Sequence, residues 1–146
     1  MQIKQDAQWY LAEIVVHITV ENDPRSVVHT NMILVQASSD EEAYKKAVQY
    51  GKAEEQTYEN SDGQRVVSRF RGLHNLSRIY DDLQHGAEII YSEDIGMDES
   101  QIEARVTPKQ NLNVFKSSKP TEGPDYSSRD IMREAYEIIS TNKNEE

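Results

Sequence analysis

The chain has 146 residues, a length that predicts one domain with a single hydrophobic core. Its 26 acidic and 16 basic residues give a net charge of −10, which argues against binding to nucleic acid or to an anionic membrane, because both are negatively charged. There is no cysteine, so disulfides and thiolate chemistry are excluded. With no secretory leader pattern and no apolar run of membrane-spanning length, the sequence favours a cytoplasmic location.

The N-terminal region predicts a long β-hairpin. Apolar side chains alternate from Trp9 to Val20, which is the period of a strand with one buried face. Turn-forming residues around Pro24 separate this strand from a second one, predicted from Val27 to Ala37. We expect the core face of the first strand to consist of Tyr10, Ala12, Ile14, Val16, Ile18 and Val20.

A helix is predicted after this hairpin. Ser39 as N-cap, followed three residues later by Glu42, predicts a capping box. The C-terminal end of the helix is open, because Gly51 fits a C-cap while residues 52–55 also favour helix. Ala43, Ala47 and Tyr50 form its expected apolar stripe.

A second hairpin follows. Segments 56–60 and 64–73 flank an Asp-Gly pair, which is a strong hairpin signal. The second arm is expected to continue, after a bulge at Gly72, to about Tyr80.

The remaining chain predicts shorter elements. In order, these are a strand at 87–91, a helix at 98–106, a strand at 112–115, a linker at 116–127, an amphipathic helix at 128–140 and a disordered tail at 141–146. We therefore predict an α+β domain over residues 1–115. It has a single antiparallel sheet of about five strands in the order ββ-α-βββ-α, helices on one face, and an additional C-terminal helix.

Three stretches resemble the bacterial family of uncharacterised domains called DUF4288. They are the strand WYLAEIVVHI, the helix SSDEEAYKKAVQYGKAEE and the following block TYENSDGQRVVSRFRGL, and the resemblance covers roughly residues 8 to 115. It implies no activity and no catalytic residue.

Two histidines were considered as metal ligands. If the residue numbers of paired positions in the first hairpin sum to 46, His17 and His29 lie directly opposite each other. Two ligands are too few for a stable site, so a third donor such as Glu13 or a partner residue would be needed. We favour a solvent-facing polar pair and predict no metal and no cofactor.

Arginines mark the predicted second hairpin. Arg65, Arg69 and Arg71 project from one face, where guanidinium groups suit phosphate or carboxylate ligands, with Glu59 nearby. The alternative is cross-strand pairing with acids, since Ile79 to Ala104 contains eight acidic residues and no lysine or arginine. Cross-strand pairing is the favoured interpretation.

The first hairpin also carries apolar residues on its expected outer face, namely Trp9, Leu11, Val15 and Val35. Such a face needs a cover, which the C-terminal helix with Ile131 and Ile138, a second copy of the chain, or another protein could supply. No catalytic motif occurs in the chain. The sequence therefore predicts a non-enzymatic interaction domain that forms a homo-oligomer, a dimer, or binds a protein partner. The alternative is a small-ligand or anion-binding domain, or an enzyme, that uses an arginine-lined face.

Overall fold

The structure is a computed structural model that describes residues 8–116 and 123–129. The chain divides into two compact units. The described part of the first comprises residues 8–90 and 123–129, and that of the second comprises residues 91–116.

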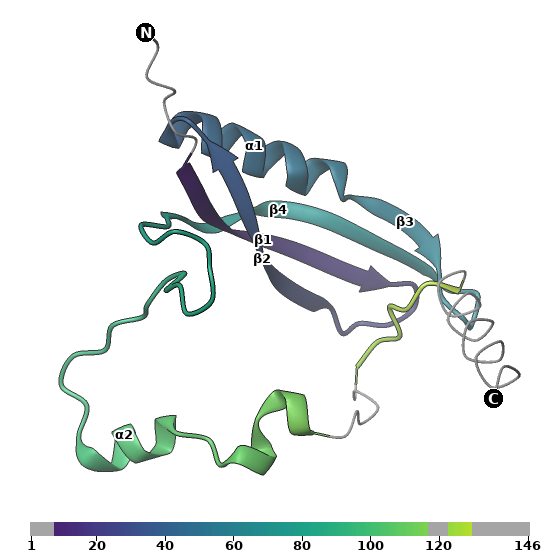
Figure 1. Cartoon of the computed structure of the whole chain (residues 1–146). Helices are drawn as coiled ribbons and strands as arrows, with labels where there is room; N and C mark the ends of the chain where they lie inside the picture. Colours follow the sequence, from purple (N-terminus) through teal and green to yellow (C-terminus); the bar gives the residue numbers. More distant parts are fainter. Residues whose placement is uncertain (1–7, 117–122, 130–146) are drawn as a thin grey trace, which may run out of the picture. The chain divides into compact units, whose positions relative to one another are not determined.

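The first unit is built on one antiparallel sheet of four strands in the order β2-β1-β4-β3. The strands are β1 (Gln8–Val20), β2 (Val27–Ala37), β3 (Gln56–Glu59) and β4 (Arg65–Arg78), and α1 (Asp40–Ala53) lies along one face of the sheet (Figure 1). The predicted α+β class with a single antiparallel sheet is confirmed. The predicted count of about five strands is wrong.

Neither of the strands predicted at 87–91 and 112–115 forms. Residues 87–91 follow β4 without pairing with any strand of the sheet, although β3 occupies that edge of β4 only along Arg65–Ser68. Its apolar residues Ile89, Ile90 and Tyr91 are exposed. Residues 113–115 form a 3₁₀ turn in which the N–H of Phe115 donates to the carbonyl of Leu112.

The predicted core face of β1 is confirmed, because Tyr10, Ala12, Ile14, Val16, Ile18 and Val20 are all buried. They form one cluster with Val66 of β4 and with residues of α1. Asp40 links the first turn of α1 to this sheet by hydrogen bonds. Its carboxylate accepts hydrogen bonds from the Tyr10 hydroxyl at 2.8 Å and from the Arg78 guanidinium at 2.6 Å.

The beginning of α1 follows the prediction only in part. Ser39 is the N-cap, and its hydroxyl accepts a hydrogen bond from the backbone N–H of Glu42 at 3.1 Å. The Glu42 carboxylate, however, accepts from the hydroxyl and backbone N–H of Ser38, one residue before the cap. Glu42 therefore does not close the expected capping box with Ser39, because it binds the preceding residue, Ser38.

Small residues let α1 lie close to the sheet. The buried positions of the helix are Ala43, Ala47 and Gly51, spaced by four residues, and the expected Tyr50 is instead exposed. Gly51 lies inside the helix rather than at its C-cap, which is Glu54. A Cβ at Gly51 would stand 2.4 Å from the Phe70 ring of β4, so glycine permits this ring to pack against the helix backbone.

The pairing of β1 with β2 differs from the expected register by one residue. Paired residue numbers sum to 45, so Val16 lies opposite His29 and His17 lies opposite Val28. Because strand side chains alternate between faces, His17 and His29 point to opposite faces of the sheet and cannot share a metal ion. The same offset places Val35 in the core.

The predicted bulge near Gly72 is confirmed. Val16 pairs with Phe70 whereas Val15 pairs with Gly72, so Arg71 is the extra residue of β4. Gly72 has a φ of 132°, a conformation that favours glycine.

In the second unit, the predicted helix is confirmed as α2 (Glu99–Arg105). Asp98 caps it by accepting from the N–H of Gln101 at 2.9 Å. The expected helix at 128–140, with Ile131 and Ile138, lies almost entirely outside the described residues. None of the helices that the structure describes is long and apolar enough to cross a membrane.

The Glu42 contacts predict that the free energy of unfolding decreases at acidic pH. The Ser38 hydroxyl, followed by Lys46, lowers the pKa of Glu42 from 4.5 to about 2. A carboxylate whose pKa is lower in the folded state stabilises the fold above pH 4.5, and this stabilisation is lost as the pH falls toward about 2. Glu42→Gln should therefore reduce the acid-induced loss of stability, measured by denaturant unfolding across this range. Ser38→Ala should move the loss to higher pH, and an unchanged acid-induced loss in both variants would contradict the assignment.

Gly51→Ala should destabilise the protein although alanine is the better helix former. The helix propensity gained is about 1 kcal/mol, while overpacking a core costs about 1–3 kcal/mol, so we expect a net loss of about 1 kcal/mol. Urea unfolding measures this difference. Lys52→Ala, an exposed change in the same helical turn, is the matched control and should leave the unfolding midpoint nearly unchanged.

Candidate functional site

The two edges of the sheet differ in length and chemistry. The β3 edge has only four residues and ends in Glu59. The β2 edge has eleven residues, VVHTNMILVQA, with no proline and no aspartate, glutamate, lysine or arginine. Its register with β1 is unbroken. Soluble proteins usually blunt an edge strand with charges, prolines, bulges or short length, and β2 has none of these features.

The outer face, meaning the sheet face turned away from α1, carries an apolar stripe on β2. Val28 is 60% exposed, Met32 64% and Leu34 48%. Of the residues predicted for this face, Trp9 and Val15 are half-buried, whereas Leu11 is only 6% exposed. The predicted placement of Val35 on the outer face is wrong, because the one-residue offset sends it to the core.

The predicted arginine group lies on exposed positions of β4. Arg65 pairs in register with Glu59 of β3, and Arg69 pairs with His17 of β1. The guanidinium of Arg71 stands 3.3 Å from Nδ1 of His17. Within residues 8–90 and 123–129, none of these three arginines makes an ion pair, so pairing with the acids of residues 79–90 is not formed.

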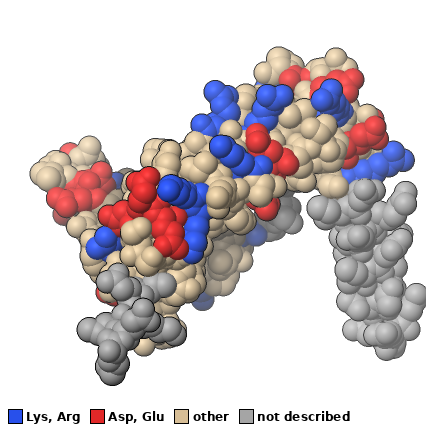
Figure 2. All heavy atoms as spheres, turned by 90° about the horizontal axis from the view of Figure 1, so that it is seen from above, with Lys and Arg blue, Asp and Glu red and all other residues tan. Residues whose placement is uncertain are grey.

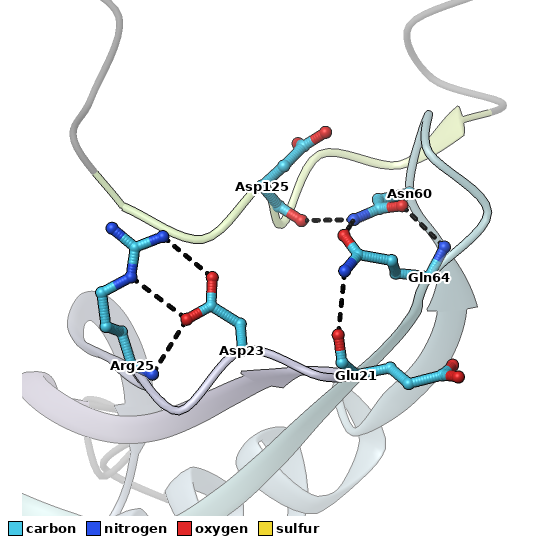
Figure 3. A network of polar contacts seen from close by, with 6 residues as sticks. All are labelled: Glu21, Asp23, Arg25, Asn60, Gln64 and Asp125. Carbon is cyan, nitrogen blue, oxygen red and sulfur yellow. Dashed lines mark hydrogen bonds and ion pairs between the residues drawn. The ribbon is translucent and has the colours of Figure 1, made fainter.

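Residues 123–129, here called the strap, are tied to the β3–β4 turn through Asn60. The Asn60 side chain is fully buried, with 0% exposure, and its amide nitrogen donates to the backbone carbonyl of Asp125 at 2.9 Å and to Gln64 Oε1 at 3.0 Å (Figure 3). Its oxygen accepts from the backbone N–H groups of Asp62 and Gln64. All hydrogen-bonding capacity of this buried amide is therefore used within the fold.

The same network reaches the end of β1. Gln64 donates from Nε2 to the backbone carbonyl of Glu21 at 2.9 Å (Figure 3). The Glu21 carboxylate accepts from the backbone N–H of Arg65. Nearby, Arg25 donates two guanidinium hydrogen bonds to Asp23 and so holds the β1–β2 turn. Both hairpin turns of the sheet are thus fixed by side-chain hydrogen bonds.

The strap covers part of a cavity of about 230 Å³ on the helix side of the sheet. Tyr58 of β3 donates its hydroxyl to the backbone carbonyl of Tyr126. The Tyr126 ring meets His29 of β2 edge-on, with ring centres 5.3 Å apart. Burial, followed by the charge of Asp125, raises the pKa of Tyr58, so its hydroxyl stays protonated as a donor at neutral pH.

Hydrogen bonds from Ser127 and Ser61 lower the pKa of Asp125 and keep this strap residue ionised.

Acidic and basic side chains lie side by side on the face drawn in Figure 2. No group of three or more potential metal ligands occurs within the described residues.

A family model for DUF4288, a domain of unknown function, matches residues 9–92. The chain belongs to the DUF4288 family. The match spans the whole four-stranded sheet and α1, but not the strap, so the cavity of this DUF4288 protein combines residues from inside and outside the matched region. No curated protein and no solved structure matches the chain.

Sequence reasoning missed Asn60 and Tyr126 as structural partners of the site. Asn60 had one local signal, its position just before the Asp-Gly turn, where asparagine oxygens commonly accept from nearby backbone N–H groups. Tyr126 lies 68 residues after Tyr58, and no sequence period links the two.

Asn60→Ala should loosen the β3–β4 turn and the strap together. Two backbone N–H groups and one carbonyl lose their partner, which predicts a loss of about 2–3 kcal/mol in the free energy of unfolding. Limited proteolysis should also cut the strap faster than in the wild type. Ser61→Ala, which removes only an exposed hydrogen bond to Asp125, is the control and should cost less than about 1 kcal/mol. Equal effects of the two substitutions would contradict the role of Asn60.

Proposed function

We propose that this DUF4288 domain is a self-associating interaction module, in which the β2 edges of two copies pair antiparallel. The observation that carries the proposal is the β2 edge itself, eleven residues long, uncharged, unbroken and bordered by Val28, Met32 and Leu34 on the outer face. An edge strand presents unpaired N–H and C=O groups, and a second strand can complete the ladder.

A second copy is the occupant that the charge pattern favours. The protein carries a net charge of −10, so two copies repel each other over most contacts. Strand β2 contributes none of this charge, and it lets two acidic chains approach without placing like charges opposite each other in the ladder. Pairing about a two-fold axis also uses the same residues on both sides, as in most homodimers.

The pairing of two β2 edges is limited at the C-terminal end of the strand. The ammonium group of Lys46 donates to the backbone carbonyl of Gln36 at 2.8 Å, so this end of β2 already has a partner in α1. The portion from Val28 to Leu34 combines exposed apolar side chains with an outer edge that no other strand of the described residues pairs with. Burying these side chains at a dimer interface would add hydrophobic stabilisation to the backbone hydrogen bonds.

The test is the mass of the protein in solution. Light scattering with size exclusion should give about twice 16.8 kDa for the wild type. Met32→Lys should shift it to the monomer, because lysine on an edge strand opposes strand pairing. Glu13 lies directly opposite Met32 within the same copy, so the new charge is tolerated by the monomer.

Ile95→Lys is the matched control, since Ile95 is an exposed apolar residue outside the sheet. It should retain the dimer mass. Hydrogen exchange gives a second readout, in which the backbone amides of β2 gain protection as the protein concentration rises. A monomeric wild type, or a Met32→Lys variant that dimerises as well as the wild type, would overturn the proposal.

A further inference from the structure

The cavity on the helix side of the sheet has a floor and a rim of different chemistry. Ile14, Val16 and Ile18 of β1 form the apolar floor. The rim is formed by the C-terminal end of α1, by β2 and β3, and by the strap. A volume of about 230 Å³ lies just below the ~300 Å³ at which pockets for drug-sized ligands begin, so the space suits a small molecule.

Aromatic rings converge on this cavity from four separate elements. Tyr50 comes from α1, Tyr58 from β3, Phe70 from β4 and Tyr126 from the strap. Two of them are held in place: the Tyr58 hydroxyl donates to the Tyr126 carbonyl, and Phe70 packs where Gly51 leaves room for its ring. A cation in this space would be attracted to the face of any ring that it meets, because the face of an aromatic ring is negative.

The charged groups of the rim have one sign. Glu54 and Glu55 line the cavity, and no lysine or arginine does. One carboxylate oxygen of Glu55 accepts from the N–H of Phe70 at 3.2 Å, while the part of the chain that the structure describes offers the Glu54 carboxylate no hydrogen-bond donor. An anionic ligand would meet repulsion here, and a cation would meet attraction.

The position of Glu54 in α1 also favours a bound cation. It is the C-cap of a fourteen-residue helix, where the helix dipole favours cations and disfavours carboxylates. An acid at this end lowers the stability of the isolated domain slightly, and a bound cation would reverse that effect. We infer that the cavity binds a small organic cation with a methylated ammonium group, placed between the aromatic rings and the carboxylate of Glu54.

Polar residues that border the cavity add a second feature to the ligand. Ser68 of β4 is buried, and His29 and Asn31 of β2 border the same space. Hydroxyl, imidazole and amide groups suit a neutral hydroxyl at the other end of the molecule. Choline, a trimethylammonium alcohol, therefore serves as the probe, and 3,3-dimethylbutan-1-ol is its neutral isostere, with carbon in place of the charged nitrogen.

The experiment is a titration of the full chain with both compounds, followed by NMR shifts of backbone amides. Choline should bind in the millimolar range or tighter and shift resonances of His29 and Phe70, while the isostere should bind about ten-fold more weakly, because the cation–π and carboxylate attractions are absent. Failure of choline to bind at millimolar concentration, or equal binding of the two compounds, would overturn the inference.

Two glutamate variants separate a ligand contact from a purely structural role. Glu54→Gln should weaken choline binding several-fold, leave the isostere unaffected and raise the melting temperature slightly, since an acid leaves the helix C-terminus. Glu41→Gln, at the opposite end of α1, makes the same chemical change and should leave choline binding unchanged. Equal choline binding by Glu54→Gln and the wild type would count against the assigned position of the ligand.

The inference does not depend on self-association. Met32 points to the outer face, while the cavity opens on the helix side of the sheet. The Met32→Lys variant should thus bind choline like the wild type even as a monomer. Loss of binding in this variant would contradict the separation of the two surfaces.

Discussion

The register between β1 and β2 decides which side chains each surface of this protein receives. Val16 lies opposite His29, so the core residues of β1 share a face with His29 and Asn31. Because side chains alternate along a strand, a shift of one residue would exchange the two faces of β2 completely. The cavity would then lose its histidine and asparagine, and Met32 would be pressed into the core. Both proposed surfaces depend on this one offset.

Strand β1 was predictable and the register of β2 was not, for a physical reason. In β1, one parity carries most of the aliphatic residues. In β2, both parities carry apolar residues: Val27, Ile33 and Val35 lie on one face, and Val28, Met32 and Leu34 lie on the other. A two-residue turn would have fixed the register, but residues 21–26 form a longer connection that is compatible with either pairing. The apolar pattern therefore could not select the face that meets α1.

Local chemistry predicted what local contacts decide. The Ser39 cap, the Asp-Gly turn and the bulge beside Gly72 each depend on a few neighbouring residues. The absent fifth strand shows the converse, since residues 87–91 have strand-like composition yet do not pair with the sheet. The candidate cavity could not be predicted from local sequence either. Its aromatic rings come from α1, β3, β4 and the strap, which only the tertiary fold brings together.

The helix dipole has opposite effects on the acids at the two ends of α1. Asp40, Glu41 and Glu42 stand at the N-terminus of the helix, where the dipole favours them, and Asp40 and Glu42 also have donors from other segments. Glu54 stands at the opposite end, where the dipole opposes it. Residues placed against local preference are expected at functional sites, since elsewhere they only lower stability. This contrast within one helix is the reason to look for a cation near Glu54 rather than near the first turn.

Antiparallel pairing of two β2 edges would join two four-stranded sheets into one of eight strands, related by a two-fold axis perpendicular to the sheet. That symmetry keeps both α1 helices on the same side, and with them both cavities. His29 and Asn31 line the cavity from β2, the strand that would form the seam. The two surfaces are thus chemically separate but share a strand.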